Sequence, residues 1–198
     1  MTRAQLGRPV GASGEVTRQR IIVATMRCVA KVGYSRATIR EIARTAKVTS
    51  ASLYNYFPNK SDLIKAAIAA RTDVALPRLR RAAAGPGDVI DRIEAVLDES
   101  GQLMREYPDL AAFEWAIRAE SALALGSEVA GSRGFQAFGE IIESIIEDAY
   151  PPGAVEAIYS LIYGLTESAA TLPAEEYHAA LSAAKELIRG TLLGQAGQ

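Results

Sequence analysis

The chain has 198 residues, of which 49% are apolar and 23% charged, and its formal net charge at pH 7 is −1. This is the composition of an ordinary globular chain, long enough for one large domain or two small ones. Cys28 and His178 are its single cysteine and single histidine, so disulfide frameworks and Cys/His metal sites are excluded by number alone. We expect no metal and no cofactor.

No apolar run approaches the ~20 residues that span a bilayer. The first residues also lack the apolar stretch of a secretory signal. The sequence therefore predicts a cytoplasmic protein without a membrane partner.

The charges are distributed very unevenly. Residues 1–60 hold 11 Lys and Arg but only two acids, Glu15 and Glu41, which gives a net charge of +9. The remaining residues have a net charge of −10. A dense basic segment suits a polyanion such as DNA, because each neutralised phosphate releases condensed counterions, whereas an acidic segment is repelled from it. A solvated basic face without a partner is the alternative explanation.

Residues 1–16, rich in Gly, Ser and Pro, indicate a flexible arm in which Gly7-Arg8-Pro9 resembles a minor-groove hook. The first helix is predicted from an N-cap at Thr17 to a stop at Gly33. Thr38 and Glu41 form a T-x-x-E capping box for a short second helix.

Residues 47–49 interrupt this pattern, and a third short helix is expected from about Ser50 to Phe57, where Pro58 ends it. Two short helices joined by a three-residue turn are typical of a helix-turn-helix, with the first helix packed across both. Asn59 can cap a fourth helix, which we expect to kink at Pro77 and to end at residues 85–87.

Further helices are predicted at about 88–106, 108–123, 133–149, 153–171 and 174–193, with Pro108, Pro152 and Pro173 near helix starts. No strand-like alternation of useful length appears. The predicted fold is all-α, with an arm (1–16), a three-helix head containing the helix-turn-helix (17–60) and a larger helical domain (61–198).

Val48, Leu53 and Phe57 are predicted to point inward, which turns most of the third helix outward, toward a DNA major groove. Its small and polar side chains could contact base edges, and Arg40 could form two hydrogen bonds with a guanine. Residues near helix ends and turns could contact phosphates. The predicted DNA-binding residues are Thr17, Thr38, Arg40, Lys47, Thr49, Ser50, Ala51, Ser52, Tyr54, Asn55, Tyr56 and Lys60.

The segment from Thr38 to Lys60 resembles the DNA-binding signature of the TetR family of bacterial regulators, as does Gly33-Tyr34 before it. The resemblance covers about 45 residues. It implies a homodimer that binds double-stranded operator DNA, and a helical body that dimerises and holds a small-molecule effector. Lys47 departs from the pattern, since members usually carry a turn glycine there; lysine adds modest strain if its φ is positive.

This resemblance and the helical spacing together predict two groups of functional residues in the body. Aromatic and polar residues of the middle helices would line the effector cavity: Met104, Tyr107, Phe113, Trp115, Arg118, Phe135 and Phe138. Apolar and small residues of the last two helices would form the dimer interface: Val155, Ile158, Tyr159, Ile162, Gly164, Ala184 and Leu187. Plain core packing is the alternative for both groups.

The function expected is that of a ligand-responsive transcriptional regulator, a repressor released from a near-palindromic operator by a small apolar effector. One alternative is an all-helical enzyme or carrier that uses the body cavity. The other is an architectural DNA-binding protein without a ligand. The absence of nucleophile, metal and phosphate-loop motifs opposes an enzyme, and the large acidic body opposes a simple DNA-coating role.

Overall fold

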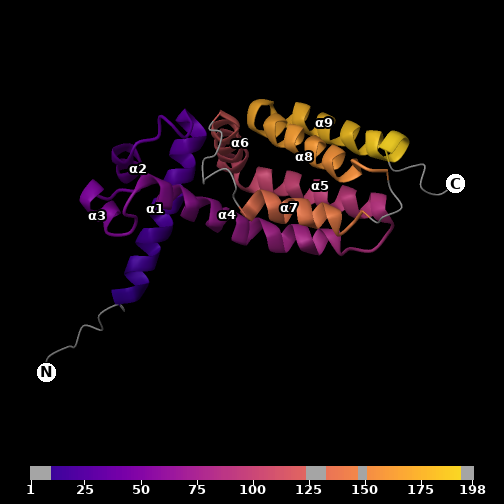
Figure 1. Cartoon of the computed structure of the whole chain (residues 1–198). Coiled ribbons are helices and arrows are strands. Elements are labelled where there is room, and N and C mark those ends of the chain that lie inside the picture. The colour runs from indigo at the N-terminus through magenta and orange to yellow at the C-terminus, as the bar shows by residue number, and fades with distance from the viewer. Residues whose placement is uncertain (1–9, 124–132, 147–150, 193–198) are drawn as a thin grey trace, which may run out of the picture.

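The structure is a computed structural model that describes residues 10–123, 133–146 and 151–192. Every regular element in this part of the chain is helical, which confirms the predicted all-α fold with an N-terminal head and a C-terminal helical domain (Figure 1). The elements are α1 (Val10–Val32), α2 (Ile39–Thr45), α3 (Ser50–Tyr54), α4 (Lys60–Ala83), α5 (Val89–Glu106), α6 (Pro108–Leu123), α7 (Arg133–Glu143), α8 (Ala154–Thr171), α9 (Ala174–Leu187) and the π-helical turn η1 (Ile188–Leu192). None of the described helices combines the length and apolar character needed to cross a bilayer.

Side-chain caps set the starts of the helices that shape the head. Thr38 accepts a hydrogen bond from the backbone N–H of Glu41, and Thr49 accepts one from that of Ser52. Asn59 caps α4 in the same way by accepting from the N–H of Asp62. Each cap satisfies a backbone donor that the first turn of a helix leaves unpaired.

The buried side chains form two clusters, and the first of them is the core of the head. It joins residues of α1, α2 and α3, including Ile21, Ile42 and Leu53, to the first half of α4. Phe113 and Ile117 of α6 belong to the same cluster. The head, defined here as α1 to α3, is therefore completed by two helices that lie beyond the predicted boundary at residue 60.

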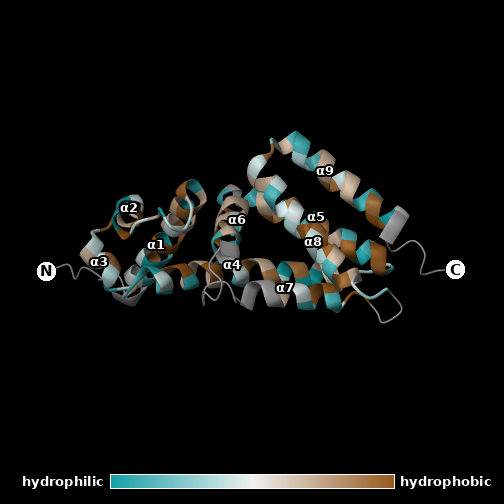
Figure 2. Cartoon of the chain, turned by 45° about the horizontal axis from the view of Figure 1, so that its top comes forward, coloured by the Kyte–Doolittle hydropathy of each residue, from teal (hydrophilic) through white to brown (hydrophobic). Residues whose placement is uncertain are grey.

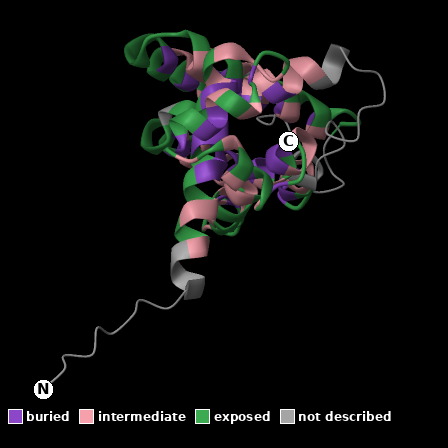
Figure 3. Cartoon of the chain, turned by 90° about the vertical axis from the view of Figure 1, so that its left-hand side faces the viewer, coloured by how far each residue is buried: buried purple, intermediate pink, exposed green. Residues whose placement is uncertain are grey.

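The second cluster is the core of the body and joins the second half of α4 to α5, α7, α8 and α9. In Figure 1, α4 runs out of the head and along the body, while α6 stands between the two. Figure 2 shows apolar and polar stretches on the same body helices, as expected for amphipathic helices with one buried face. Figure 3 shows the buried residues between the helices and the exposed ones on their outer sides.

Three predicted boundaries differ from the structure. Helix α1 begins at Val10, so residues 10–16 are helical rather than part of an arm and Thr17 is not an N-cap. Glu15 supports this extension by accepting a hydrogen bond from Gln19, one turn further along the helix. Residues 1–9, with the predicted minor-groove hook, lie outside the described residues.

Helix α3 ends at Tyr54 instead of Phe57, because the next N–H groups bond to carbonyls three residues back and Pro58 disfavours a helical residue before it. Helix α7 ends at Glu143 instead of residue 149, and Ile145 bonds three residues back to Ile142. Helix α4 continues through Pro77 to Ala83.

Candidate nucleic-acid interface and internal cavity

The turn between α2 and α3 is formed by Lys47, whose φ is +54°. This is the left-handed region, which costs a residue with a side chain roughly 1–2 kcal/mol. The N–H of Lys47 bonds to the carbonyl of Arg44, and that of Val48 to the carbonyl of Ala43, so the turn is closed by its own backbone. The Lys47 side chain is exposed beside α3.

Helix α3 has one buried and one exposed side. Leu53 is completely buried in the head core, and Phe57, just beyond the helix, is also buried. Tyr54 exposes 51% of its surface. The other predicted base-contacting residues are exposed, as Ala51 and Asn55 are, or half-buried, as Ser50 and Ser52 are.

The remaining predicted DNA-binding residues include Arg40, the candidate guanine reader, and the candidates for phosphate contacts. Thr38, Arg40 and Thr49 are exposed at the starts of α2 and α3, and Tyr56 is half-buried after α3. Thr17 is half-buried within α1, seven residues after the helix begins.

Lys60 has an internal role that the sequence did not reveal. Its ammonium group donates to the backbone carbonyls of Tyr34 and Ser35, and it lies 4.4 Å from the centre of the Tyr34 ring. Burial lowers the pKa of Lys60 from its ordinary value, while the negative charge of Glu120 opposes that shift. Lys60 therefore fixes the loop between α1 and α2 to the start of α4.

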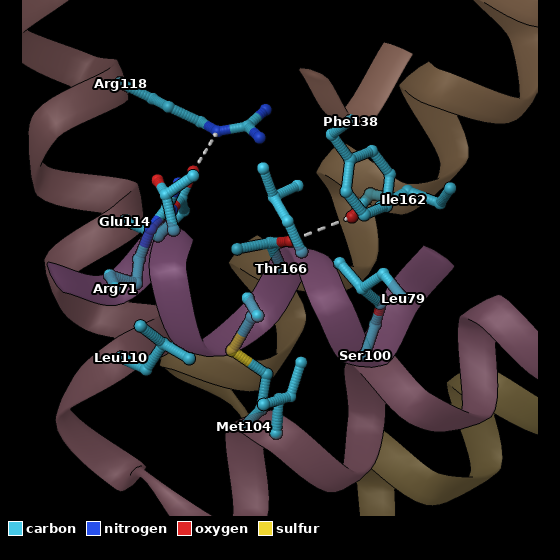
Figure 4. A pocket seen from close by; sticks show the side chains of 14 residues that line it. Arg71, Leu79, Ser100, Met104, Leu110, Glu114, Arg118, Phe138, Ile162 and Thr166 are labelled. Carbon is cyan, nitrogen blue, oxygen red and sulfur yellow. Dashed lines mark hydrogen bonds and ion pairs between the residues drawn. The ribbon is translucent and has the colours of Figure 1, made fainter. Parts of the chain in front are cut away.

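The body contains an internal cavity of about 70 Å³ between α4, α5, α6, α7 and α8 (Figure 4). Met104, Arg118 and Phe138 of the predicted effector site lie on its wall. The described residues that line it are Arg71, Thr72, Ala75, Leu76, Leu79, Ser100, Leu103, Met104, Leu110, Glu114, Arg118, Phe138, Ile162 and Thr166.

The other predicted effector residues do not line this cavity. Phe113 is buried in the head core. Trp115 lies in a separate surface hollow bordered by the loop at residues 33–36, and Tyr107 lies in a neighbouring groove. Phe135 has its side chain outside the described part of the structure. Helical spacing alone could not tell which face of α6 meets the head and which meets the cavity.

Three charged side chains meet at one end of the cavity. Glu114 forms ion pairs with both Arg71 and Arg118, and the latter pair joins Arg118 Nε to Glu114 Oε1 at 3.1 Å. The exposed fractions of the Arg71, Glu114 and Arg118 side chains are only 14%, 5% and 10%. Burial, followed by the positive charge of Arg118, lowers the pKa of Arg71 to about 10.

The sequence carries a signal that marks Arg71 as unusual. It follows Ile64 and Ile68 at the spacing of one helix face, where an apolar residue would be the ordinary choice. A charged residue that continues a buried stripe indicates a buried partner or a ligand.

An aromatic pair extends this charged cluster toward the surface hollow. The Arg118 guanidinium lies 4.5 Å from the centre of the Tyr163 ring, and Tyr163 makes an edge contact with Trp115 at 5.8 Å between ring centres. Trp115 is the only tryptophan in the chain. Its fluorescence should therefore respond to changes around Arg118.

A larger groove of about 310 Å³ lies next to the cavity, between α1, α4 and the α5–α6 junction. Arg71, Ala75, Leu103 and Leu110 line both spaces. The groove and the cavity thus share one wall, and that wall includes a buried arginine.

The predicted dimer residues need a correction. Ile158, Ile162 and Ala184 are buried in the core of their own chain, because α8 and α9 turn these side chains toward the other body helices. Val155 and Tyr159 are half-buried, and Leu187 exposes 53% of its surface. A methyl group added at Gly164 would meet no heavy atom of a neighbouring described residue within 4 Å, so this part of α8 is open.

Comparison with known proteins identifies the head. Residues 21–67 match the family model described as bacterial regulatory proteins, tetR family. Residues 21–67 thus carry the DNA-binding region of the TetR family. The matched segment runs from α1 into α4 and contains the helix-turn-helix and the buried α4 residues Leu63, Ile64 and Ala67 of the head core.

Curated HTH-type transcriptional regulators match part of this chain. The HTH-type transcriptional regulator SrpR of Pseudomonas putida is 39% identical over 66 residues, which cover 33% of this chain and 31% of that protein. The HTH-type transcriptional repressor KstR of Mycolicibacterium smegmatis is 30% identical over 91 residues, 46% of this chain and 45% of that protein. The match thus spans less than half the length of these relatives.

Solved structures resemble the chain over most of its length. FadR from Bacillus subtilis, solved in complex with stearoyl-CoA, has a TM-score of 0.73 at 17% identity and covers 88% of this chain and 98% of its own. LfrR from Mycobacterium smegmatis, solved in complex with proflavine, has a TM-score of 0.64 at 24% identity and covers 91% of this chain and 98% of its own. At these identities the likeness shows that the TetR fold extends through the body.

Proposed function

We propose that this protein is a homodimeric, ligand-responsive transcriptional repressor that works in the cytoplasm and binds a near-palindromic operator. The observation that carries the proposal is the exposed side of α3. The side chains of Ala51, Tyr54 and Asn55 are exposed there instead of being packed in a core. Leu53 anchors this short helix in the core, and Thr49 caps it. A DNA major groove is wide enough to admit such a helix, so these side chains could reach base edges.

The charge distribution supports the same function. Residues 1–60 carry the net charge of +9, so their electrostatic field attracts DNA. The acidic body would be repelled from the phosphates, and this favours an orientation in which only the head approaches the duplex.

Helix α6 supports ligand responsiveness, because some of its residues pack in the head core while their neighbours line the cavity. Phe113 and Ile117 are buried in the head core, while Glu114 and Arg118 form the charged end of the cavity. A ligand that moves Glu114 and Arg118 must move Phe113 and Ile117 with them, since all four lie on one helix. We propose that this helix, together with α4, transmits occupancy of the cavity to the angle of the head.

A symmetric dimer is proposed through the outer sides of α8 and α9. Gly164 leaves room for a close helix approach, and Leu187 offers apolar surface to a second copy. Two heads held by a two-fold axis would read two half-sites related by the same symmetry.

A footprint of the purified protein on the DNA upstream of its own gene tests the proposal. The expected result is a protected segment with two half-sites, whose affinity falls steeply as salt rises. Equal affinity for all sequences would instead support the architectural alternative. Failure to bind any DNA at low salt would support the enzyme or carrier alternative.

A further inference from the structure

The groove of about 310 Å³ between α1, α4 and the α5–α6 junction is lined by large apolar side chains that belong to neither core. They are Val23 of α1, Val74 of α4 and Tyr107, which joins α5 to α6. Each of these three residues leaves nearly half of its surface exposed. Apolar surface gathered in one hollow is typical of a binding site, because its contact with water is unfavourable.

The size of the groove suits a small organic molecule. Small-molecule sites usually have volumes of ~300–1,000 Å³, and the groove lies at the lower end of this range. The cavity beside it, at about 70 Å³, is too small for the same molecule. A stable protein partner would need to cover ~800 Å² of this chain, which requires an extended surface rather than a single hollow.

The charges that line the groove balance one another. The described residues of its wall include two arginines and two acidic residues. Each of these four has a partner of opposite charge, in the pairs Arg27–Asp109, Glu106–Arg78 and Arg71–Glu114. An ionised ligand would lose part of its hydration at a place where the charges already satisfy one another. The groove therefore favours a ligand without charge.

We propose that this groove is a ligand site separate from the cavity, and that it takes an uncharged, largely apolar molecule of about the size of a naphthalene ring system. Such a ligand would contact α1 of the head together with α4 and the α5–α6 junction. It would stabilise the arrangement of head and body in which the groove exists. Any effect of the ligand on DNA affinity, unlike the site itself, rests on the proposed function.

Naphthyl compounds that differ in charge test the ligand class. We would measure the binding of 2-(2-naphthyl)ethanol, 2-naphthylacetate and 2-(2-naphthyl)ethylammonium to the full chain by calorimetry. The alcohol should bind at least about threefold more tightly than either ion, because it loses no ionic hydration. If either ion binds as tightly as the alcohol, or the alcohol does not bind at about 1 mM, the proposal is overturned.

Val74→Asp tests the location of the ligand. It adds a carboxylate to the wall of the groove, so the affinity for the alcohol should fall by about tenfold or more, while the ammonium compound should lose less. Val23→Asp makes the same change on the side formed by α1 and carries the same expectation, should the first variant not fold.

Val16→Asp is the matched control, since Val16 is an exposed valine of α1 that does not line the groove. It should leave the affinity for the alcohol unchanged. An equal loss in Val16→Asp and the two groove variants would contradict the placement of the ligand. Circular dichroism establishes that each variant has the helix content of the wild type.

Phe138→Ala distinguishes the groove from the cavity, because Phe138 lines the cavity and not the groove. The affinity for the alcohol should not change in this variant. A loss or gain as large as the effect of Val74→Asp would place the ligand in the cavity and overturn the proposal.

A second copy of the chain is the competing occupant of the groove. If Val74→Asp weakens the dimer in sedimentation and the alcohol does not bind the wild type, the groove is a subunit interface and not a ligand site. Operator affinity is measured separately. An alcohol that binds in the groove without changing operator affinity would leave the site standing and would count only against regulation through it.

Discussion

The Ser35 hydroxyl lies 2.8 and 2.9 Å from the two carboxylate oxygens of Glu120, and so joins the loop after α1 to the end of α6. Near the other end of α6, Arg27 of α1 pairs with Asp109 at 3.2 Å. The head is therefore held to α6 by a polar contact near each end of that helix, with the buried Phe113 and Ile117 between them.

We expect Glu120→Ala to loosen the loop between α1 and α2 while the body stays intact. The lost hydrogen bond should raise amide exchange of the peptide covering residues 33–37 by about two- to tenfold, since one such bond contributes ~0.5–1.5 kcal/mol. Hydrogen exchange followed by mass spectrometry measures this directly. Glu140→Ala, at an exposed position of α7, is the control. Equal exchange in both variants would mean that the contact does not restrain the loop.

Tyr54→Ala should weaken operator binding without affecting folding, because Tyr54 is exposed on α3 and makes no contribution to the head core. A loss of ~1–3 kcal/mol, on the order of tenfold or more, is expected for a residue at a base-reading surface. Fluorescence anisotropy with labelled operator measures it. Tyr107→Ala removes the same side chain from a 47% exposed position near the α5–α6 junction and should leave DNA affinity as it is. Similar affinities for the two variants would contradict the placement of the DNA surface.

Lys60→Met should lower the melting temperature by a few degrees even without DNA, because two backbone carbonyls lose their donor. Thermal unfolding followed by circular dichroism measures the change, and Lys65→Met, at an exposed position of the same helix, is the control. The salt dependence of operator binding distinguishes a second role. A slope reduced by about one would show that Lys60 also contacts a phosphate. An unchanged slope would restrict Lys60 to holding the loop.

Gly164→Arg should weaken the proposed dimer by about tenfold or more while leaving each subunit folded. The Cβ of the new side chain has free space within the described part of its own chain, and the rest of the side chain would stand in the way of a second copy. Sedimentation over a range of concentrations measures the change. Gly139→Arg on α7 is a close match, since a methyl group added there also meets no heavy atom within 4 Å. Equal dimerisation of both variants would place the interface elsewhere.

Glu94→Gln should make the protein less sensitive to acid. Hydrogen bonding to Arg189 holds the pKa of the buried Glu94 below its usual value. Because the folded-state pKa is the lower one, this stabilisation is fully present above the ordinary Glu pKa of ~4.3 and is lost as the pH falls through the folded-state value.

The variant should therefore melt a few degrees lower at pH 7, and its melting temperature should fall less below about pH 4.3 than that of the wild type. Melting curves across this pH range provide the measurement. Asp98→Asn, which removes the exposed partner of Lys185, is the control and should have a small effect at every pH. Parallel curves for wild type and Glu94→Gln would contradict the assignment.

Local chemistry explains which parts of the fold could be predicted from the sequence. Thr38 and Asn59 mark helix starts because a cap needs only a side-chain oxygen and an N–H two or three residues away. Pro108 likewise marks the start of α6. Such signals do not depend on the rest of the chain, and the helices they define were placed to within a few residues.

The choice of neighbour could not be predicted in this way. The stripe containing Ile158 and Ile162 was correctly read as apolar, but an apolar stripe packs equally well against its own chain or a second one. Phe113 was assigned to the cavity for the same reason, although it belongs to the head core. These assignments depend on how a helix is rotated about its axis by its tertiary contacts, which its own sequence does not specify.

Lys47 has a consequence for attempts to make this protein more robust. Its left-handed backbone conformation would be relaxed by glycine, so Lys47→Gly should raise the melting temperature. The same change removes a positive charge from the surface beside α3, which is the proposed operator-binding surface. Selection for heat resistance alone would thus accumulate weaker operator binders, and a screen that demands both properties should retain lysine at this turn.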